Sequence, residues 1–281
     1  MDFRTLIRVD ELQRHLAAPN LVIFDCRHDL MKPDAGAQAY AHGHIPGARF
    51  AHNDTDLSGP KTGRTGRHPL PDAGVFMSWL GRNGVDAGKQ VVAYDHAGGA
   101  SATRLWWMLR HWLGHERVAV LDGGWEAWVK AEGPVTAELP RIAATRFSGT
   151  PRPVWVDVDY VRSHLNDPDV TVVDARSPER YRGETEPIDP VAGHIPGARN
   201  RLYKENLDAS GRFKPAAMLR AELTALLDGR RPDQIVHQCG SGVSACHNIL
   251  AMEIAGLTGS RLYPGSWSEW CADPSRPVAR G

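Results

Sequence analysis

Gly43-His-Ile-Pro-Gly-Ala-Arg49 recurs letter for letter as Gly193-His-Ile-Pro-Gly-Ala-Arg199, and this repeated heptapeptide decides the fold. Shortly before it, one copy has Leu21-Val-Ile-Phe-Asp-Cys-Arg27 and the other has Val170-Thr-Val-Val-Asp-Ala-Arg176. A match of this length at equivalent places does not arise by chance. The chain is therefore one unit written twice, and gene duplication is the simple explanation.

The landmarks after the heptapeptide also agree in order, but the two copies differ in chemistry. Val91-Val-Ala-Tyr-Asp95 in the first copy corresponds to Gln234-Ile-Val-His-Gln-Cys239 in the second. Near the end of each copy stand Asp122-Gly-Gly-Trp-Glu-Ala-Trp128 and Pro264-Gly-Ser-Trp-Ser-Glu-Trp270. An aspartate thus stands in the first copy where the second has a cysteine.

Short runs rich in Val and Ile alternate with longer stretches of helical period in both copies. This pattern predicts an α/β fold, with a mainly parallel sheet flanked by helices in each of two tandem domains. The predicted strands are 21–24, 91–94, 170–173 and 234–237, and the predicted helices are 103–111, 215–227 and 244–255.

The domain boundaries follow from a proline-rich stretch between the copies. Gly133 to Pro153 contains four prolines and no sustained apolar period, as expected for an extended linker. We therefore expect a first domain over residues 1–135, a linker over 136–153 and a second domain over 154–281.

Composition excludes several classes of protein. Of the 281 residues, 42% are hydrophobic and 23% are charged, which is typical of a globular protein. The 33 basic and 33 acidic side chains cancel, so no overall charge favours nucleic acid or a membrane as partner. No signal peptide or membrane-spanning run is found, and we expect a cytoplasmic protein. The four cysteines are too few and too scattered for a disulfide framework or a structural zinc site.

Cys239-Gly-Ser-Gly-Val-Ser-Ala245 lies between a predicted strand and a predicted helix. Its glycines let the backbone curl so that successive N–H groups point inward, and the helix adds its positive end. A thiolate at Cys239 would be stabilised there as an anion and is the candidate nucleophile. A cysteine-dependent phosphatase would need a guanidinium about six residues after the cysteine, where this chain has Ala245.

These motifs together resemble the rhodanese-like sulfurtransferases of the tandem-domain type, with an inactive first copy and a catalytic second copy. The Cys239 loop is most similar to that of the 3-mercaptopyruvate sulfurtransferases. The resemblance implies a double displacement in which Cys239 takes a sulfur atom from a small donor as a persulfide and passes it to cyanide or a thiol, with a thioredoxin-like protein as one option. It implies no metal and no cofactor.

The resemblance also implies roles for individual residues. Ser241 would act with His68 and Asp54, and Arg180, with Arg182 as a helper, would bind the donor's carboxylate or sulfonate. The rest of the loop would surround the donor: Gly240, Gly242, Val243 and Ser244.

The donor and the mode of action stay open. Mercaptopyruvate enzymes usually carry a second arginine shortly after the first, where this chain has Glu186-Pro-Ile-Asp-Pro190. Thiosulfate enzymes tend to have basic residues in the loop, and Gly240-Ser241 supplies none. Arg64 or Arg67 is a candidate for the absent charge. The alternative function is a persulfide carrier in a protein sulfur relay, which would load once without turnover.

Overall fold

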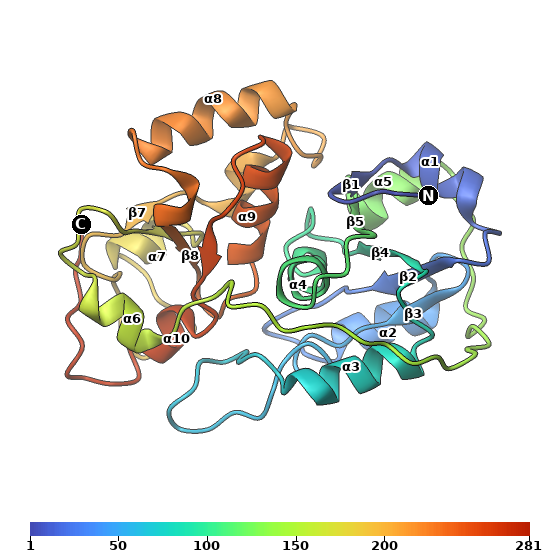
Figure 1. Ribbon diagram of the computed structural model, residues 1–281, viewed down its shortest axis with the longest axis horizontal. Helices are drawn as coiled ribbons and strands as arrows, with labels where there is room; N and C mark the ends of the chain where they lie inside the picture. Colours follow the sequence, from blue (N-terminus) through green and yellow to red (C-terminus); the bar gives the residue numbers. More distant parts are fainter. The chain divides into compact units, whose positions relative to one another are not determined.

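A computed structural model describes residues 1–281, and the chain divides into two compact units. Unit 1 comprises 1–59, 70–152 and 210–212, and unit 2 comprises 60–69, 153–209 and 213–281. Each unit contains its own parallel sheet with helices packed on it (Figure 1). The short segment Pro60–Pro69 comes from the first repeat but packs with unit 2.

Unit 1 has a five-stranded parallel sheet in the order β1-β5-β4-β2-β3. The strands are β1 (Leu6–Ile7), β2 (Leu21–Asp25), β3 (Ala48–Phe50), β4 (Gln90–Tyr94) and β5 (Val118–Leu121). The helices are α1 (Val9–His15), α2 (Ala35–His42), α3 (Ala73–Arg82), α4 (Ala102–Trp107), the π-helical η1 (Met108–Trp112) and α5 (Gly124–Lys130).

Unit 2 has a four-stranded parallel sheet in the order β7-β6-β8-β9. The strands are β6 (Thr171–Asp174), β7 (Arg199–Asn200), β8 (Ile235–Gln238) and β9 (Arg261–Leu262). The helices are α6 (Val158–Ser163), α7 (Pro178–Arg182), α8 (Ala216–Leu227), α9 (Ala245–Ile254) and α10 (Ser266–Trp270), with 3-10 turns η2 (Tyr203–Asn206) and η3 (Pro232–Gln234). Where unit 1 has β1, unit 2 has a single parallel bridge from Trp155 to Leu262.

The predicted α/β architecture is confirmed in both units. The four central strands, β2, β4, β6 and β8, lie within one residue of the predicted ranges, and α8 and α9 match the predicted helices equally well. The predicted helix 103–111 is α4 continued by η1, because the backbone widens to π-helical hydrogen bonding after Trp107. The stretch 136–152 contains no helix or strand and packs along unit 1, where Thr145 N–H donates to Gly81 O (2.8 Å).

The repeated motifs of unit 1 meet around one buried ion pair. The Arg27 guanidinium donates to the Asp25 carboxylate at 2.6 Å and to the carbonyl of Gly43 at 2.6 Å. Its plane lies over the Trp125 ring, 4.4 Å from the ring centroid. One arginine therefore joins the first strand, the heptapeptide and the Gly-Gly-Trp motif.

Unit 2 repeats this arrangement with its own residues. Arg176 donates to Asp174 at 2.7 Å and to the carbonyl of Gly193 at 2.7 Å, and its guanidinium lies 4.7 Å from the Trp267 ring centroid. A buried arginine needs such partners, since an unpaired charge in the core costs several kcal/mol. The repeated sequence is thus explained by a repeated structural clamp.

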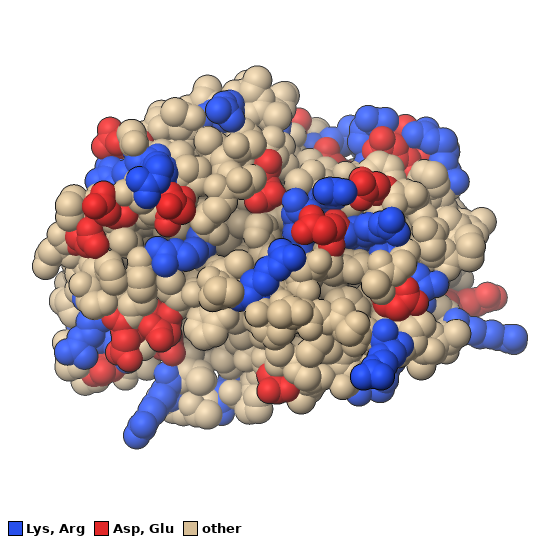
Figure 2. Space-filling model, viewed as in Figure 1, with Lys and Arg blue, Asp and Glu red and all other residues tan.

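Apolar side chains fill the core of each unit between the sheet and its helices. The strands β4, β5, β6 and β8 are buried along their whole length, as expected for parallel strands covered on both faces. Figure 2 shows basic and acidic side chains interspersed over the visible face, in agreement with the balanced charge of the sequence. No helix combines the length and the apolar character needed to cross a bilayer.

Candidate active site

Cys239 directly follows β8, at the carboxyl end of a strand that lies between β6 and β9. Open parallel sheets bind their ligands at this edge because loops and helix N-termini converge there. The cysteine is free and only 2% exposed. Its position therefore suits a nucleophile that is shielded from solvent.

Hydrogen bonds with residues of α10 fix the backbone of the loop. The Cys239 N–H donates to Ser266 Oγ at 3.1 Å, and the Cys239 carbonyl accepts from the Trp267 N–H at 3.0 Å. The next carbonyl, that of Gly240, accepts from the Ser268 N–H at 2.9 Å. The loop is thus held in its curled form by contacts outside itself.

Gly242 supplies a donor to the sulfur. Its N–H donates to Cys239 Sγ at 3.1 Å. Its φ is +77°, and a Cβ at this position would lie 2.4 Å from the carbonyl oxygen of Pro264. Only glycine allows this backbone to approach so closely, so the donor to the sulfur depends on a glycine here.

The end of the loop leads directly into α9. Ser244 is the residue before the first turn, and the carbonyls of Val243 and Ser244 accept from the N–H groups of Cys246 and His247, each at 3.1 Å. The helix therefore begins within the loop and presents its positive end to the Cys239 side of the unit.

Ser241 and His68 form a buried pair within unit 2. His68 Nδ1 lies 2.6 Å from Ser241 Oγ, and the two residues are 2% and 5% exposed. A hydroxyl that shares a proton with an imidazole can give a proton to a developing oxyanion and recover it afterwards. Ser241 and His68, which the resemblance named and which lie far apart in the sequence, are thus in contact.

Segment 60–69 carries His68 to this place through its own contacts. A Cβ on Gly66 would lie 2.3 Å from the carbonyl oxygen of Gly265, so the two backbones touch. The next residue, Arg67, donates its N–H to Ser268 Oγ at 3.0 Å. The segment is therefore fixed against the same turn that holds the Cys239 backbone.

Two guanidinium groups lie beside Gly240. A Cβ at Gly240 would lie 2.7 Å from Arg67 Nη2 and 3.7 Å from both Nη atoms of Arg180. The absence of a side chain at Gly240 therefore makes room for Arg67. The positive charge that the loop itself lacks is supplied from outside it.

Two buried carboxylates hold these arginines. Glu186 accepts from Arg180 Nη2 at 2.7 Å and Nε at 3.2 Å, and Asp189 accepts from Arg180 Nη2 at 3.2 Å and from Arg67 Nη1. Burial raises the pKa of Asp189. Burial acts in the same direction on Glu186, but the pKa of Glu186 is lowered because hydrogen bonds from Arg180 and from the Asp189 and Ile188 N–H groups outweigh burial.

The other predicted residues make contacts within their own units. Asp54 belongs to unit 1, where its N–H donates to His52 Nδ1 at 3.1 Å. Arg182 is exposed and pairs with Glu184 at 2.6 Å, so its contacts do not bring it to the Cys239 loop. Arg64 is exposed, and its N–H donates to Thr62 Oγ1 at 3.3 Å.

Sequence reasoning missed the residues that support the site. Ser266 and Ser268 carried no signal because serines near a turn are common. Asp189 stood in a stretch that attracted attention only because it lacks an arginine. The signal that would have revealed them is the pair of acids Glu186 and Asp189, three residues apart beside prolines and close to arginines in the sequence, which is a pattern that fits a buried ion-pair network.

The matching loop of unit 1 already contains an anion. The Asp95 carboxylate accepts four backbone N–H groups, from Ala97, Gly99, Ser101 and Ala102, at 2.7 to 2.9 Å. Asp95 follows β4 as the thiol follows β8 in the other unit. The carboxylate therefore stands where unit 2 has a thiol, and it takes up four of the N–H donors of the loop.

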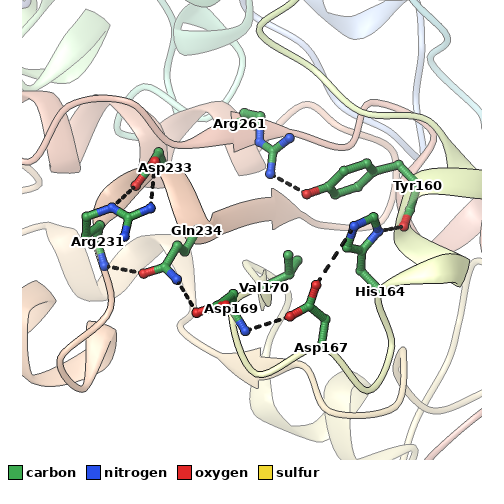
Figure 3. A pocket seen from close by; sticks show the side chains of 9 residues that line it. All are labelled: Tyr160, His164, Asp167, Asp169, Val170, Arg231, Asp233, Gln234 and Arg261. Carbon is green, nitrogen blue, oxygen red and sulfur yellow. Dashed lines mark hydrogen bonds and ion pairs between the residues drawn. The ribbon is translucent and has the colours of Figure 1, made fainter.

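A separate pocket of about 310 Å³ lies at the amino-terminal edge of the unit 2 sheet (Figure 3). Its polar groups pair with one another: Arg231 with Asp233, and Arg261 with the Tyr160 hydroxyl at 2.6 Å. Its lining is Tyr160, His164, Asp167, Asp169, Val170, Arg231, Asp233, Gln234 and Arg261. Because this pocket contains no thiol and its polar groups pair with one another, the loop at the opposite edge of the sheet is the better candidate for the chemistry.

The groups around Cys239 suit a small anion. Two arginines, a hydroxyl and an imidazole offer hydrogen-bond donors and positive charge, whereas a hard metal ion would need several oxygen ligands facing the site. The Glu186 and Asp189 carboxylates are already bound to arginines. Chemically, this arrangement can bind a carboxylate or sulfonate next to a thiol.

Comparison with known proteins agrees with this chemistry. The model of the rhodanese-like domain matches residues 8–131 and 157–273. A Pseudomonas aeruginosa protein named "Probable 3-mercaptopyruvate sulfurtransferase" is 45% identical over the full length of both chains. A Mycobacterium tuberculosis protein named "Putative thiosulfate sulfurtransferase SseB" is 37% identical, over 99% of this chain and 98% of its own.

A solved structure gives the same result. SseA from Escherichia coli, described with the 3-mercaptopyruvate sulfotransferases, superposes with a TM-score of 0.82 at 31% identity, over 95% of this chain and 100% of its own. Both repeats, the parallel sheets and the cysteine loop are thus accounted for together. The chain belongs to the rhodanese-like family and is a sulfurtransferase enzyme built from two rhodanese-like domains.

Proposed function

We propose that unit 2 transfers a sulfane sulfur by double displacement through a persulfide on Cys239, with 3-mercaptopyruvate as the donor it fits best. The observation that carries this proposal is the arrangement around the thiol. Cys239 Sγ accepts an N–H in a shielded loop, Ser241 of the same loop pairs with His68, and arginines lie beside Gly240.

In the first half-reaction the Cys239 thiolate attacks the donor sulfur. The new S–S bond forms as the C–S bond of the donor breaks, and the electron pair of that bond goes to the enolate of pyruvate. The donor's thiol proton ends on the pyruvate methyl group, so that persulfide anion and pyruvate are the products. The loop N–H groups stabilise the negative persulfide.

We place each end of the donor against a separate set of polar groups. The carboxylate fits against Arg67 Nη2 and Arg180 Nη1, the guanidinium nitrogens that are not bonded to Asp189 or Glu186. The ketone oxygen fits the Ser241 hydroxyl, which donates a hydrogen bond as the enolate develops. Thiosulfate has no ketone oxygen, which is why we favour mercaptopyruvate over it.

In the second half-reaction an acceptor attacks the outer sulfur. Cyanide forms a C–S bond as the S–S bond breaks, which releases thiocyanate and restores the Cys239 thiolate. A thiol acceptor, such as a small thiol or a thioredoxin-like protein, would form a new persulfide in the same way. We place this exchange in the cytoplasm, where such thiols are kept reduced.

The persulfide is tested by mass spectrometry of the intact protein after exposure to 3-mercaptopyruvate without acceptor. We expect Cys239→Ser to abolish the mass increase of one sulfur atom and all turnover. Cys271→Ser is the matched control, because Cys271 is a buried cysteine at the end of α10, and it should load and turn over as the wild type does. Retained turnover in Cys239→Ser would disprove the mechanism.

Steady-state kinetics separate the enzyme from the persulfide carrier. With cyanide as acceptor, an enzyme shows repeated turnover and the parallel-line pattern of a ping-pong reaction, whereas a carrier loads once and stops. Thiosulfate assayed alongside 3-mercaptopyruvate decides the donor. A preference for thiosulfate would contradict the assigned role of the Ser241 hydroxyl.

A further inference from the structure

Arg67 and Arg180 come from distant parts of the sequence but share one carboxylate. Arg67 Nη1 donates to Asp189 Oδ1, and Arg180 Nη2 donates to Asp189 Oδ2 at 3.2 Å. The Asp189 side chain is 3% exposed, whereas Arg67 and Arg180 are 20% and 16% exposed. The buried Asp189 carboxylate thus bridges the partly exposed guanidinium groups of Arg67 and Arg180.

The bridge leaves one end of each arginine available. Arg180 uses Nε and Nη2 on Glu186 and Asp189, so its Nη1 is not engaged by these acids. Arg67 uses Nη1 on Asp189, and its Nη2 points to Gly240. Both available nitrogens lie close to the same point beside the catalytic loop.

Without the bridge the two guanidinium groups would not hold this arrangement. Like charges at such close range repel each other in a partly buried site. Arg67 also stands on an irregular segment, and its long side chain has no second carboxylate, whereas Arg180 keeps the two-pronged contact with Glu186. Removing Asp189 therefore releases Arg67 in particular.

We propose that Asp189 is a positioning residue for the donor site, which holds the Arg67 guanidinium against Gly240 so that Arg67 and Arg180 grip one anionic donor together. This inference rests on the proposed function, and it makes Asp189 a determinant of the preference of that site for an anionic donor. Asp189 stands in the stretch Glu186–Pro190, where a second arginine was expected from the resemblance. Here the acid recruits the second arginine from segment 60–69.

The test is a double-mutant cycle on donor KM with cyanide as acceptor. We expect Asp189→Asn and Arg67→Ala each to raise the KM for 3-mercaptopyruvate by about tenfold, with kcat changed less than about twofold, since one charged hydrogen bond to a ligand is lost in either case. If Asp189 acts through Arg67, the double variant should resemble either single variant, and the two effects should not multiply.

The matched control is Glu184→Gln. Glu184 is an acid in the same part of the chain that pairs with the exposed Arg182, and its loss should leave the donor KM unchanged. The KM for cyanide should be unchanged in every variant, because the acceptor does not need the two arginines. A general loss of structure would change both half-reactions and the unfolding midpoint.

Three outcomes would overturn the inference. The effects of Asp189→Asn and Arg67→Ala on the donor KM could multiply in the double variant, or Asp189→Asn could have the donor KM of the wild type. The donor KM of Asp189→Asn could also be lower than that of the wild type, which would show that the charge of Asp189 weakens donor binding. If Asp189→Asn does not fold, Arg67→Lys decides, because one ammonium cannot serve both Asp189 and the donor, and its KM should rise as in Arg67→Ala.

Calorimetric titration with pyruvate, the expected product, gives a readout that does not depend on turnover. Affinity should fall in parallel with the rise in KM. Failure of the proposed function looks different, because the wild-type chain itself would then load no sulfur from the donor.

Discussion

At the scale of single residues, the site depends on a few groups with separate tasks. Cys239 is the proposed sulfur nucleophile, and the Gly242 N–H donates to its sulfur. The Ser241 hydroxyl, which lies 2.6 Å from His68 Nδ1, is the side-chain donor that we propose for the ketone oxygen of the substrate. The roles can therefore be separated by the choice of donor, because only one candidate donor has a ketone oxygen.

We expect Ser241→Ala to lower kcat/KM for 3-mercaptopyruvate by about 10- to 1000-fold, the usual range for loss of an oxyanion donor or a general acid. Thiosulfate turnover should change less than about threefold, since breaking its S–S bond creates no enolate. The measurement is a side-by-side assay of both donors with cyanide. An equal loss with both donors would show that Ser241 supports the loop and not the ketone.

At the scale of elements, the loops after β4 and β8 have the same curled backbone but place different groups against their N–H donors. Each is curled by glycine with positive φ, Gly98 and Gly99 in one and Gly242 in the other, and each turns its N–H groups inward. In unit 1 the anion is the side chain of Asp95. In unit 2 the corresponding residue is Cys239, whose sulfur accepts the Gly242 N–H and would carry the persulfide in the proposed reaction.

We expect Asp95→Asn to destabilise unit 1 by about 2 to 4 kcal/mol, because an amide NH₂ would face two N–H donors that now bind a carboxylate oxygen. Hydrogen exchange of the β4 amides measures this change. Asp86→Asn is the control, since Asp86 accepts one N–H in an exposed turn and its loss should cost less than about 0.5 kcal/mol. Equal effects would refute the role assigned to the Asp95 carboxylate.

At the scale of the whole molecule, each unit has its own sheet and core and contains a buried histidine. Burial lowers the pKa of His237, in β8 of unit 2, to about 3. Burial likewise lowers the pKa of His111, in η1 of unit 1, to about 4. Both side chains are kept neutral by the fold at pH values where an unfolded chain would protonate them.

This linkage predicts the acid sensitivity of the protein. An unfolded histidine binds a proton below about pH 6.5, whereas the folded form of each binds one only near its lowered pKa. These two groups therefore leave stability unchanged above about pH 6.5 and reduce it as the pH falls from there toward 4. Each histidine contributes a slope of up to about 1.4 kcal/mol per pH unit.

We expect His237→Leu to flatten the pH dependence of unit 2 stability between about pH 6 and 4. Urea unfolding or hydrogen exchange of β6 and β8 amides at several pH values checks this. Val236→Ala, a cavity-forming change in the same strand, is the control, because it should lower stability by the same amount at every pH. An unchanged slope in His237→Leu would contradict the assignment.

Much of the architecture was determined by local sequence patterns. The repeated heptapeptide, the Val-rich strands and the glycine loop after β8 are short-range signals, because period, turn geometry and burial are set within a few residues. The pairing of Ser241 with His68 was predicted from the resemblance to the 3-mercaptopyruvate sulfurtransferases, because both residues match positions of that family. The role of Asp54 stays a prediction.

Only the tertiary structure decided which distant side chains share the site. Segment 60–69 has no periodicity to say where it packs, yet its docking against Gly265 and Ser268 brings His68 and Arg67 to the loop of the other repeat. Asp189 is a buried carboxylate, and its burial is explained by its ion pairs with Arg67 and Arg180. The sequence gives no local sign of the pair with Arg67, because the two residues are more than a hundred positions apart. The sequence by itself determined the repeated α/β units and the glycine loop that follows the Cys239 thiol, because these are local patterns, and long-range packing determined which charged side chains surround that thiol.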